Sequence, residues 1–343
     1  MSTTSPDIPT AREQSLRVRL IPYLDRYGVW LLVLLMVVIM AILQPDVFFS
    51  WRNLTNIGRQ NVMNALLALG MFVVIVTAGI DLSVGSTLAL GMMALAVTVI
   101  RDKAPWYLGI GLPLLMGLLV GLVNGLTLTK LRLPHPFIAT LGTQFIVRGL
   151  TNIISGGVPF SGLPEEVRLL GARDFYTSPL LGEGRDFPIA VVVVLVCYGL
   201  MWLFLEHTRT GRHIYAIGGN PQAARVSGIN VDGTLTLVYT LCGLFAGVAA
   251  LMLAGRTNSG FPNAGLGSEL DAISAVIIGG ASFFGGRGSV AGTLAGVLVI
   301  GLLRNALNLL GVQVFWQQVL IGVVIIVAVW LDVLRRKAGS AGG

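Results

Sequence analysis

Amide and hydroxyl side chains recur inside the longest apolar stretches of this sequence. Such groups exchange hydrogen bonds with a neutral polar solute and release it again, whereas a fixed charge holds its partner more strongly. Asn61 and Asn64 are three residues apart, so on a helix they share one face. Hydrogen bonding between helices is the alternative role, which we expect for roughly half of these side chains. The residues predicted to line a solute pathway are Asn61, Asn64, Asn124, Thr140, Gln144, Arg148, Arg304, Asn305 and Asn308.

The histidines and paired glycines do not form a catalytic pattern. His135, His207 and His213 stand apart from any arrangement of serine and acid that is typical of a triad or a metal site. The glycine pairs in residues 278–288 are not followed by lysine and serine or threonine, so no phosphate-binding loop is predicted. We therefore expect no catalytic residue, no metal site and no cofactor.

Three acids stand beside apolar stretches. Asp81 lies in TAGIDLSVGS, residues 77–86, where it either caps the following helix or marks a span that is interrupted inside the protein. Capping is the favoured interpretation. Glu269 and Asp271 open another apolar stretch, where they either stabilise the start of a helix through its dipole or face a cavity.

The composition determines which elements must position these side chains. Of the 343 residues, 55% are hydrophobic and 11% are charged, against roughly 25% charged in a soluble domain. The apolar stretches are about 17 to 22 residues long, the length that a helix needs to cross a bilayer. The 44 glycines suit close helix packing in lipid, and Cys197 and Cys242 lie inside apolar stretches as packing residues. The prediction is an all-α integral membrane protein.

About ten transmembrane helices are expected within a transmembrane domain at residues 28–334. A polar tail and surface helix precede it at 1–27, and a short tail follows at 335–343. The net charge of +7 comes from basic residues beside the spans, which indicates topology rather than nucleic-acid binding and favours both termini in the cytoplasm. The spans are expected near 28–43, 62–77, 85–100, 108–129, 137–154, 188–205, 235–254, 270–284, 290–310 and 315–330.

Two connecting segments are too long to be simple turns. Residues 155–187 are expected to form a structured external segment, and residues 206–233 a cytoplasmic one. In the second, Asn220 is placed to cap a short helix that ends before Gly228. This helix either docks on a partner or only links two spans. The residues assigned to docking are Gly218, Gly219, Asn220, Pro221, Ala223, Ala224 and Gly228.

Four segments together resemble a known family. They are AIGGNPQAARVSGINV at 216–231, TAGIDLSVGS at 77–86, HPFIATLGTQFIVRGL at 135–150, and ELDAISAVIIGGASFFGGRGSVAGTLAGVLVIGLL at 269–303. The chain is similar, from about residue 29 to 334, to the ABC sugar permeases of the ribose, xylose, arabinose and galactose type. The resemblance implies an inner-membrane permease dimer, a periplasmic sugar-binding protein outside and a tandem-domain ATPase inside, which hydrolyses the ATP. It also implies that residues 216–228 hold a coupling helix that contacts this ATPase.

Two other classes remain as alternatives. An ion-coupled secondary transporter would need a paired acid or histidine in the middle of the membrane, whereas the acids here stand near the predicted span ends. An ABC permease for branched-chain amino acids would share the architecture but would suit a zwitterion rather than a neutral polyol.

Overall fold

The computed structural model describes residues 11–133, 135–175 and 186–340, and these are almost entirely helical. Within this part of the chain, seven helical segments are long and apolar enough to cross a membrane. They are α3 (Trp51–Val76), α4 (Val84–Ala96) with its π-helical continuation η1 (Val97–Arg101), α5 (Trp106–Ile110) with α6 (Leu112–Lys130), α7 (Pro136–Ser155), α10 (Ile189–His207), α13 (Val231–Thr257) and α15 (Val290–Leu309).

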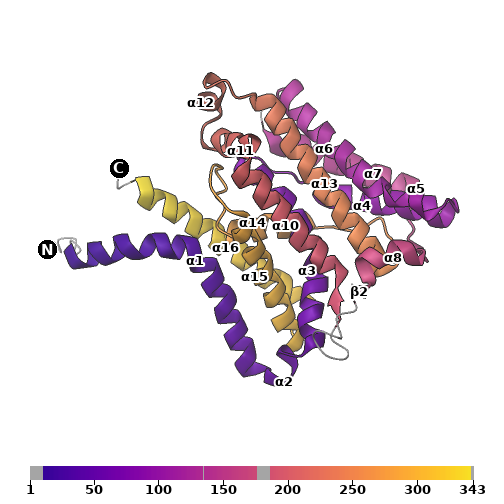
Figure 1. Cartoon of the computed structure of the whole chain (residues 1–343), viewed down its shortest axis with the longest axis horizontal. Helices are drawn as coiled ribbons and strands as arrows, with labels where there is room; N and C mark the ends of the chain where they lie inside the picture. Colours follow the sequence, from indigo (N-terminus) through magenta and orange to yellow (C-terminus); the bar gives the residue numbers. More distant parts are fainter. Residues whose placement is uncertain (1–10, 134, 176–185, 341–343) are drawn as a thin grey trace, which may run out of the picture.

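Two further helices flank the bundle. α1 (Ala11–Leu43) continues into the short α2 (Pro45–Phe48), and α16 (Val314–Ser340) is the last helix; both α1 and α16 lie at the left of the bundle in Figure 1. The apolar parts of these helices with described side chains are Tyr27–Leu43 and Val314–Val324. The predicted membrane bundle is confirmed, whereas the count of about ten transmembrane helices is not.

The span predicted at 270–284 is wrong. The helix found there, α14 (Ser268–Ile278), has only 11 residues and is therefore about 16 Å long, roughly half the thickness of a hydrocarbon core. It ends at Gly279 and Gly280, and the second of these has a φ of +89° that favours glycine. The apolar residues that follow in the sequence, around Phe283, lie in a loop rather than in a longer helix.

The most extensive contact between two helices of the bundle joins α6 to α13. Glycines recur every four residues on both helices, at Gly117, Gly121 and Gly125 and at Gly243 and Gly247. A Cβ added at Gly121 would collide with the carbonyl oxygen of Tyr239, and one added at Gly243 with that of Gly117. The two backbones therefore touch directly, as they do in other helix pairs that use small residues in lipid.

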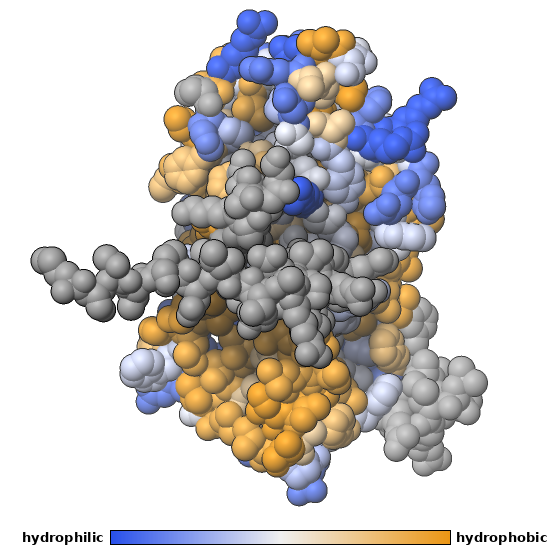
Figure 2. Space-filling model, turned by 90° about the vertical axis from the view of Figure 1, so that its left-hand side faces the viewer, coloured by the Kyte–Doolittle hydropathy of each residue, from blue (hydrophilic) through white to orange (hydrophobic). Residues whose placement is uncertain are grey.

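The core surrounds α3, whose second half is buried between α10, α13, α14 and α15. The outer faces of α6, α7 and α10 expose leucine, isoleucine and phenylalanine, as expected for contact with lipid or another apolar surface. Figure 2 shows a broad hydrophobic surface on the lower part of the face that it presents, with hydrophilic residues gathered at the upper end.

Short elements cover the two ends of the bundle. α11 (Arg209–Gly219) and α12 (Pro221–Val226) lie at the upper end in Figure 1, which we name the α12 end. At the opposite end, α8 (Glu165–Ala172) lies near two strand pairs, β1 (Phe160–Ser161) with β4 (Ser259–Gly260) and β2 (Asp174–Phe175) with β3 (Phe187–Pro188). The segment 155–187 thus has structure of its own, with residues 176–185 outside the described part.

Candidate functional site

A buried break separates α3 from α4. The chain leaves α3 at Val76, and Asp81 in the break is only 1% exposed. Its carboxylate accepts hydrogen bonds from the backbone N–H of Ser83 at 2.9 Å and from the Ser83 hydroxyl at 2.6 Å. Asp81 therefore lies inside the protein, and its carboxylate binds Ser83, the N-cap residue of α4, rather than an N–H group within the helix.

Side chains from two other helices close around this break. The Asn124 amide on α6 donates to the Asp81 carboxylate at 3.2 Å and to the Ser83 hydroxyl at 2.8 Å. The Thr140 hydroxyl on α7 donates to the carbonyl of Ile80 at 3.2 Å. Asn124 and Thr140, both predicted to line the pathway, thus meet at the break, where their donors are used within the protein.

A second cluster lies at the start of α14. Glu269 is 7% exposed, and its Oε1 accepts from the Gln144 amide at 3.3 Å. Gln144 stands near the middle of the 20-residue α7, which places the start of α14 well inside the bundle rather than at an end. The other carboxylate oxygen, Oε2, is buried and has no hydrogen-bond partner among the described residues. An unpaired buried oxygen is costly, so this atom is a candidate acceptor for a ligand.

The starts of α4 and α14 touch each other at this point. A Cβ added at Gly85 on α4 would lie 2.7 Å from Oε2 of Glu269 and closer still to the carbonyl oxygen of Gly265. Gly265 and Gly267 have φ values of +66° and +80°, which turn the chain sharply into α14. Two helices therefore begin side by side inside the bundle, and their N-terminal ends favour negative or electron-rich groups.

An ion pair involves Asp271, two residues beyond Glu269 on α14. Arg304 on α15 donates to both oxygens of Asp271 on α14, at 2.7 and 2.8 Å. The side chains are 37% and 18% exposed, so the pair reaches the protein surface between the two helices. Arg148, one turn beyond Gln144 on α7, donates to the carbonyls of Pro262 and Ala264 and so holds the chain that leads into α14.

The remaining predicted pathway residues mostly bind other parts of the bundle. Asn305 exchanges amide hydrogen bonds with Asn53 on α3, and Asn308 accepts from Gln317 on α16. Asn61 donates to the carbonyl of Ile57 in its own helix. Asn64 is buried, and its carbonyl oxygen has no partner among the described residues. Helix packing therefore accounts for Asn61, Asn305 and Asn308, which lie apart from the α4 and α14 starts.

Sequence reasoning gave too little weight to Glu269 and Asp271. Both acids stand at the start of a helix, and helix starts are normally expected at a membrane surface. The signal that could have found them is the stretch TNSGFPNAGLG before α14, because glycine and asparagine in such number indicate a long connecting segment after which a helix can begin inside the bundle.

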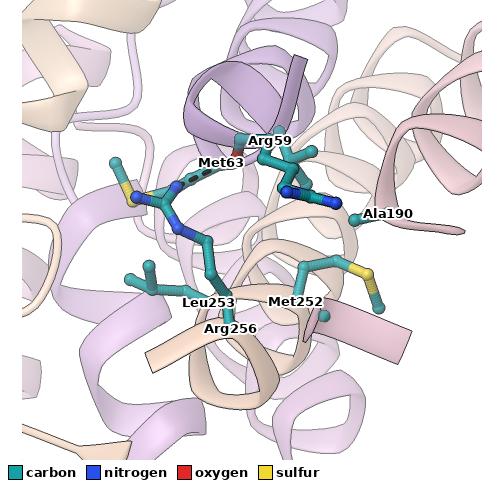
Figure 3. A pocket seen from close by; sticks show the side chains of 8 residues that line it. Arg59, Met63, Ala190, Met252, Leu253 and Arg256 are labelled. Atoms are coloured by element: carbon teal, nitrogen blue, oxygen red, sulfur yellow. Dashed lines mark hydrogen bonds between the residues drawn. The ribbon is translucent and has the colours of Figure 1, made fainter. Parts of the chain in front are cut away.

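A small pocket lies toward the opposite end of the bundle, between α3, α8, α10 and α13 (Figure 3). Arg59 and Arg256 line it, and the Arg256 guanidinium donates to the Arg59 carbonyl at 2.9 Å. Its volume of about 10 Å³ is the space of a single water molecule. This pocket is therefore too small for an organic solute.

The short helix α12 has the start that the sequence predicts. The Asn220 side chain accepts from the N–H groups of Gln222 and Ala223, both at 3.0 Å, and Pro221 occupies the first helical position. Gly228, with a φ of +83°, lies just after the end. Assigning Ala224 to a docking face is wrong, because it is 4% exposed and packs with Ile217 and Val231 of this chain.

Before α12, α11 packs on two other segments. A Cβ added at Gly218 would collide with the Val76 carbonyl at the end of α3, and that carbonyl also accepts from the N–H of Gly286. Burial and the nearby Glu206 carboxylate raise the pKa of Tyr215 to about 12, so its hydroxyl stays protonated and donates to the carbonyl of Gly288 at 3.2 Å. The end of α3, α11 and the loop after α14 therefore meet at one place.

Comparison with known proteins decides the family. Residues 53–329 match the family described as branched-chain amino acid transport system / permease component. The chain belongs to this permease family. Its relatives include the ribose import permease protein of Escherichia coli, 42% identical over 302 residues that cover 87% of this chain and 91% of the relative. The D-allose transport system permease protein of the same organism is 37% identical over 313 residues, 91% and 93% of the two chains.

A third relative extends this set. The galactose/methyl galactoside import permease protein of Escherichia coli is 37% identical over 328 residues, 91% of this chain and 95% of the relative. No solved structure matches the chain significantly. The resemblance to the sugar members of the permease family is thus confirmed over nearly the whole chain.

Proposed function

We propose that this chain is the permease subunit of an ATP-driven importer and forms the pathway by which a monosaccharide enters a bacterial cell. The observation that carries the proposal is the identity of 37 to 42% with ribose, allose and galactose permeases over 87 to 91% of the chain. The chain is a transport subunit rather than an enzyme, and ATP hydrolysis belongs to a separate ATPase. Ribose is a pentose and the other two are hexoses, so the proposal is for the monosaccharide class.

The relatives, rather than the position of the acids, argue against an ion-coupled transporter. The sequence argument was that no acid stands in the middle of a span, but Glu269 lies beside the middle of α7 and Asp81 is buried. Branched-chain amino acid import is the second candidate, because the family description names it. The three sugar permeases support a neutral polyol instead.

The partners and orientation of the chain complete the proposal. A domain at 28–334 spans the inner membrane with both termini in the cytoplasm, and the α12 end faces a tandem-domain ATPase there. A periplasmic sugar-binding protein delivers the solute to the opposite end, where β1 and β4 pair. A second permease subunit, identical or related, completes the pathway. The exposed apolar faces of the bundle supply surfaces for lipid and for this subunit.

Within the bundle, we assign solute contact to the cluster where α4 and α14 begin. Gln144, Glu269, Asp271 and Arg304 provide donors and acceptors close to the surface between α7, α14 and α15. The unpaired oxygen of Glu269 suits a sugar hydroxyl, which can donate to it.

Orientation can be tested with single cysteines in a background that lacks Cys197 and Cys242. Ser161 on β1 and Ser227 after α12 are both exposed and lie at opposite ends of the bundle. We expect an impermeant thiol reagent to label Ser161→Cys in intact cells and Ser227→Cys only after the membrane is opened. Labelling in the reverse order would show the orientation to be inverted.

The assignment of solute contact predicts that Asp271→Asn lowers sugar uptake about tenfold or more. The change removes a charged acceptor, and hydrogen bonds to charged groups contribute about 1.5 to 3 kcal/mol, where 1.4 kcal/mol is tenfold. Uptake of labelled sugar is measured at matched membrane abundance. Asp102→Asn is the control, because it removes the same charge from an exposed ion pair with Arg101 far from α14, and it should leave uptake unchanged.

A purely structural ion pair would behave differently. In Asp271→Asn, the charge of Arg304 is left unpaired. If the ion pair were only structural, the double variant Asp271→Asn/Arg304→Gln would remove this unpaired charge and restore uptake. We expect no recovery in this double variant. Recovery to the wild-type rate would contradict a role in solute contact.

A further inference from the structure

A cavity of about 390 Å³ opens at the α12 end of the bundle. It lies between the end of α6, the break after α3, the start of α13 and α12 itself. It is distinct from the cluster around Glu269, since none of that cluster's residues lines it. The volume is within the range of cavities that hold small organic ligands.

The mouth of this cavity carries a net positive charge. Its exposed charged residues are Arg132, Arg225 and Asp232. Arg225 donates to the Asp232 carboxylate at 3.0 Å, so these two charges offset each other. Arg132 forms no ion pair with any residue that the structure describes, which leaves one guanidinium free at the mouth. A free guanidinium of this kind suits a phosphate or carboxylate group.

The deep end offers a different chemistry. Thr77, Thr129 and Tyr239 line it and are buried. The Thr77 hydroxyl donates to the Val74 carbonyl at 2.8 Å, and the Thr129 hydroxyl donates to the Gly125 carbonyl at 2.8 Å. With these donors used, the two oxygens retain lone pairs that accept hydrogen bonds. The deep end therefore favours a ligand that brings its own hydroxyl donors.

We propose that this cavity binds a phosphorylated monosaccharide, with the sugar hydroxyls against Thr77 and Thr129 and the phosphate against Arg132. The proposal rests on the proposed function, which places this end in the cytoplasm and a monosaccharide in the pathway. A kinase that transfers a phosphoryl group from ATP to a hydroxyl of the imported sugar, with release of ADP and a proton, supplies such a ligand in the same compartment.

The position of the cavity gives binding a consequence for transport. A ligand there contacts Pro221 and Arg225 on α12 and Thr77 in the break after α3, so it ties the coupling helix to the bundle. Transport requires α12 to change its relation to the bundle, and a ligand that prefers one arrangement shifts the population toward it. The phosphorylated product therefore inhibits further uptake of the sugar.

Binding is tested by calorimetry on the permease in phosphatidylcholine nanodiscs, with ribose 5-phosphate and glucose 6-phosphate as probes. We expect one of them to bind, and Arg132→Gln to weaken its binding about tenfold or more. Arg209→Gln is the matched control, because it removes the same charge from an exposed residue of α11 outside the cavity. No binding of either probe, or equal binding to wild type and Arg132→Gln, would overturn the proposal.

Two further binding measurements, with inorganic phosphate and with an anionic lipid, identify the ligand. Inorganic phosphate that binds as tightly as the sugar phosphate would overturn the sugar part of the site. Loss of sugar-phosphate binding when phosphatidylglycerol is included would instead assign the cavity to an anionic lipid headgroup. We expect weaker binding of phosphate and no effect of the lipid.

Regulation is tested in proteoliposomes of the assembled importer, with ATP inside and the binding protein and sugar outside. Sugar phosphate inside should reduce uptake by the wild type and leave uptake by Arg132→Gln unchanged. Normal uptake that is insensitive to the internal sugar phosphate would overturn the regulatory site alone. Absence of uptake in wild type without sugar phosphate would instead contradict the proposed function.

Discussion

Ala223→Trp is expected to abolish sugar uptake while the chain still inserts and folds. Ala223 is exposed on α12, and Val226 on the same short helix is 91% exposed, so this surface is free for the ATPase. A bulky side chain in a packed contact costs about 1 to 3 kcal/mol, which weakens association about tenfold or more. Co-purification of the ATPase and uptake of labelled sugar measure the two effects.

The matched control is Ala172→Trp, the same change at an exposed alanine of α8, at the other end of the bundle. It should leave co-purification of the ATPase unchanged. Ala224→Trp should behave differently from both, because it overfills the cluster with Ile217 and Val231 and so lowers the amount of folded chain. Normal uptake by Ala223→Trp would show that α12 only links two spans and does not contact the ATPase.

Gly121→Leu is expected to remove most of the folded protein from the membrane. The added side chain would meet the Tyr239 carbonyl and the backbone of Thr240, so α6 and α13 would have to separate along their whole contact. Overpacking usually costs about 1 to 3 kcal/mol, and separating two backbones in contact costs more than moving a side chain. Membrane abundance and thermal unfolding of a fluorescent fusion measure the loss.

Gly199→Leu provides the comparison for this experiment. Gly199 lies on an exposed face of α10, and a Cβ added there meets nothing within 4 Å. This variant should accumulate and unfold as the wild type does. If Gly121→Leu did the same, the close contact between α6 and α13 would be incorrect.

Hydrophobic length was enough to predict most of the bundle. The seven described spans all coincide with apolar stretches of the sequence. A segment that crosses lipid must make all its backbone hydrogen bonds within one helix, so the whole span appears as one continuous apolar stretch. α14 departs from this rule because its apolar composition continues past Gly280 into a loop, where Phe283 and Phe284 are exposed. Composition does not distinguish such an apolar loop from the continuation of a helix in lipid.

Interactions between residues close in the sequence could be predicted, whereas hydrogen-bond partners far apart in the sequence could not. The Asn220 cap of α12 depends on residues two and three positions away, so the sequence contains the whole interaction. The link between Gln144 and Glu269 joins residues 125 positions apart, and the sequence does not show which of several amides meets the acid. For the same reason, Asn305 was assigned to the pathway although it pairs with Asn53.

The meeting of α11, the end of α3 and the loop after α14 has a mechanical consequence. Gly218 brings backbone against backbone at Val76 and Gly286, so no flexible side chain stands between the three segments to absorb strain. Close-packed protein compresses very little, so a displacement of α12 would be transmitted through this contact between α11, the end of α3 and the loop after α14. The end of α3 leads to the break before α4, and the loop leads back to the end of α14. A movement of α12 driven by the ATPase would therefore displace the start of α4 and the end of α14 together.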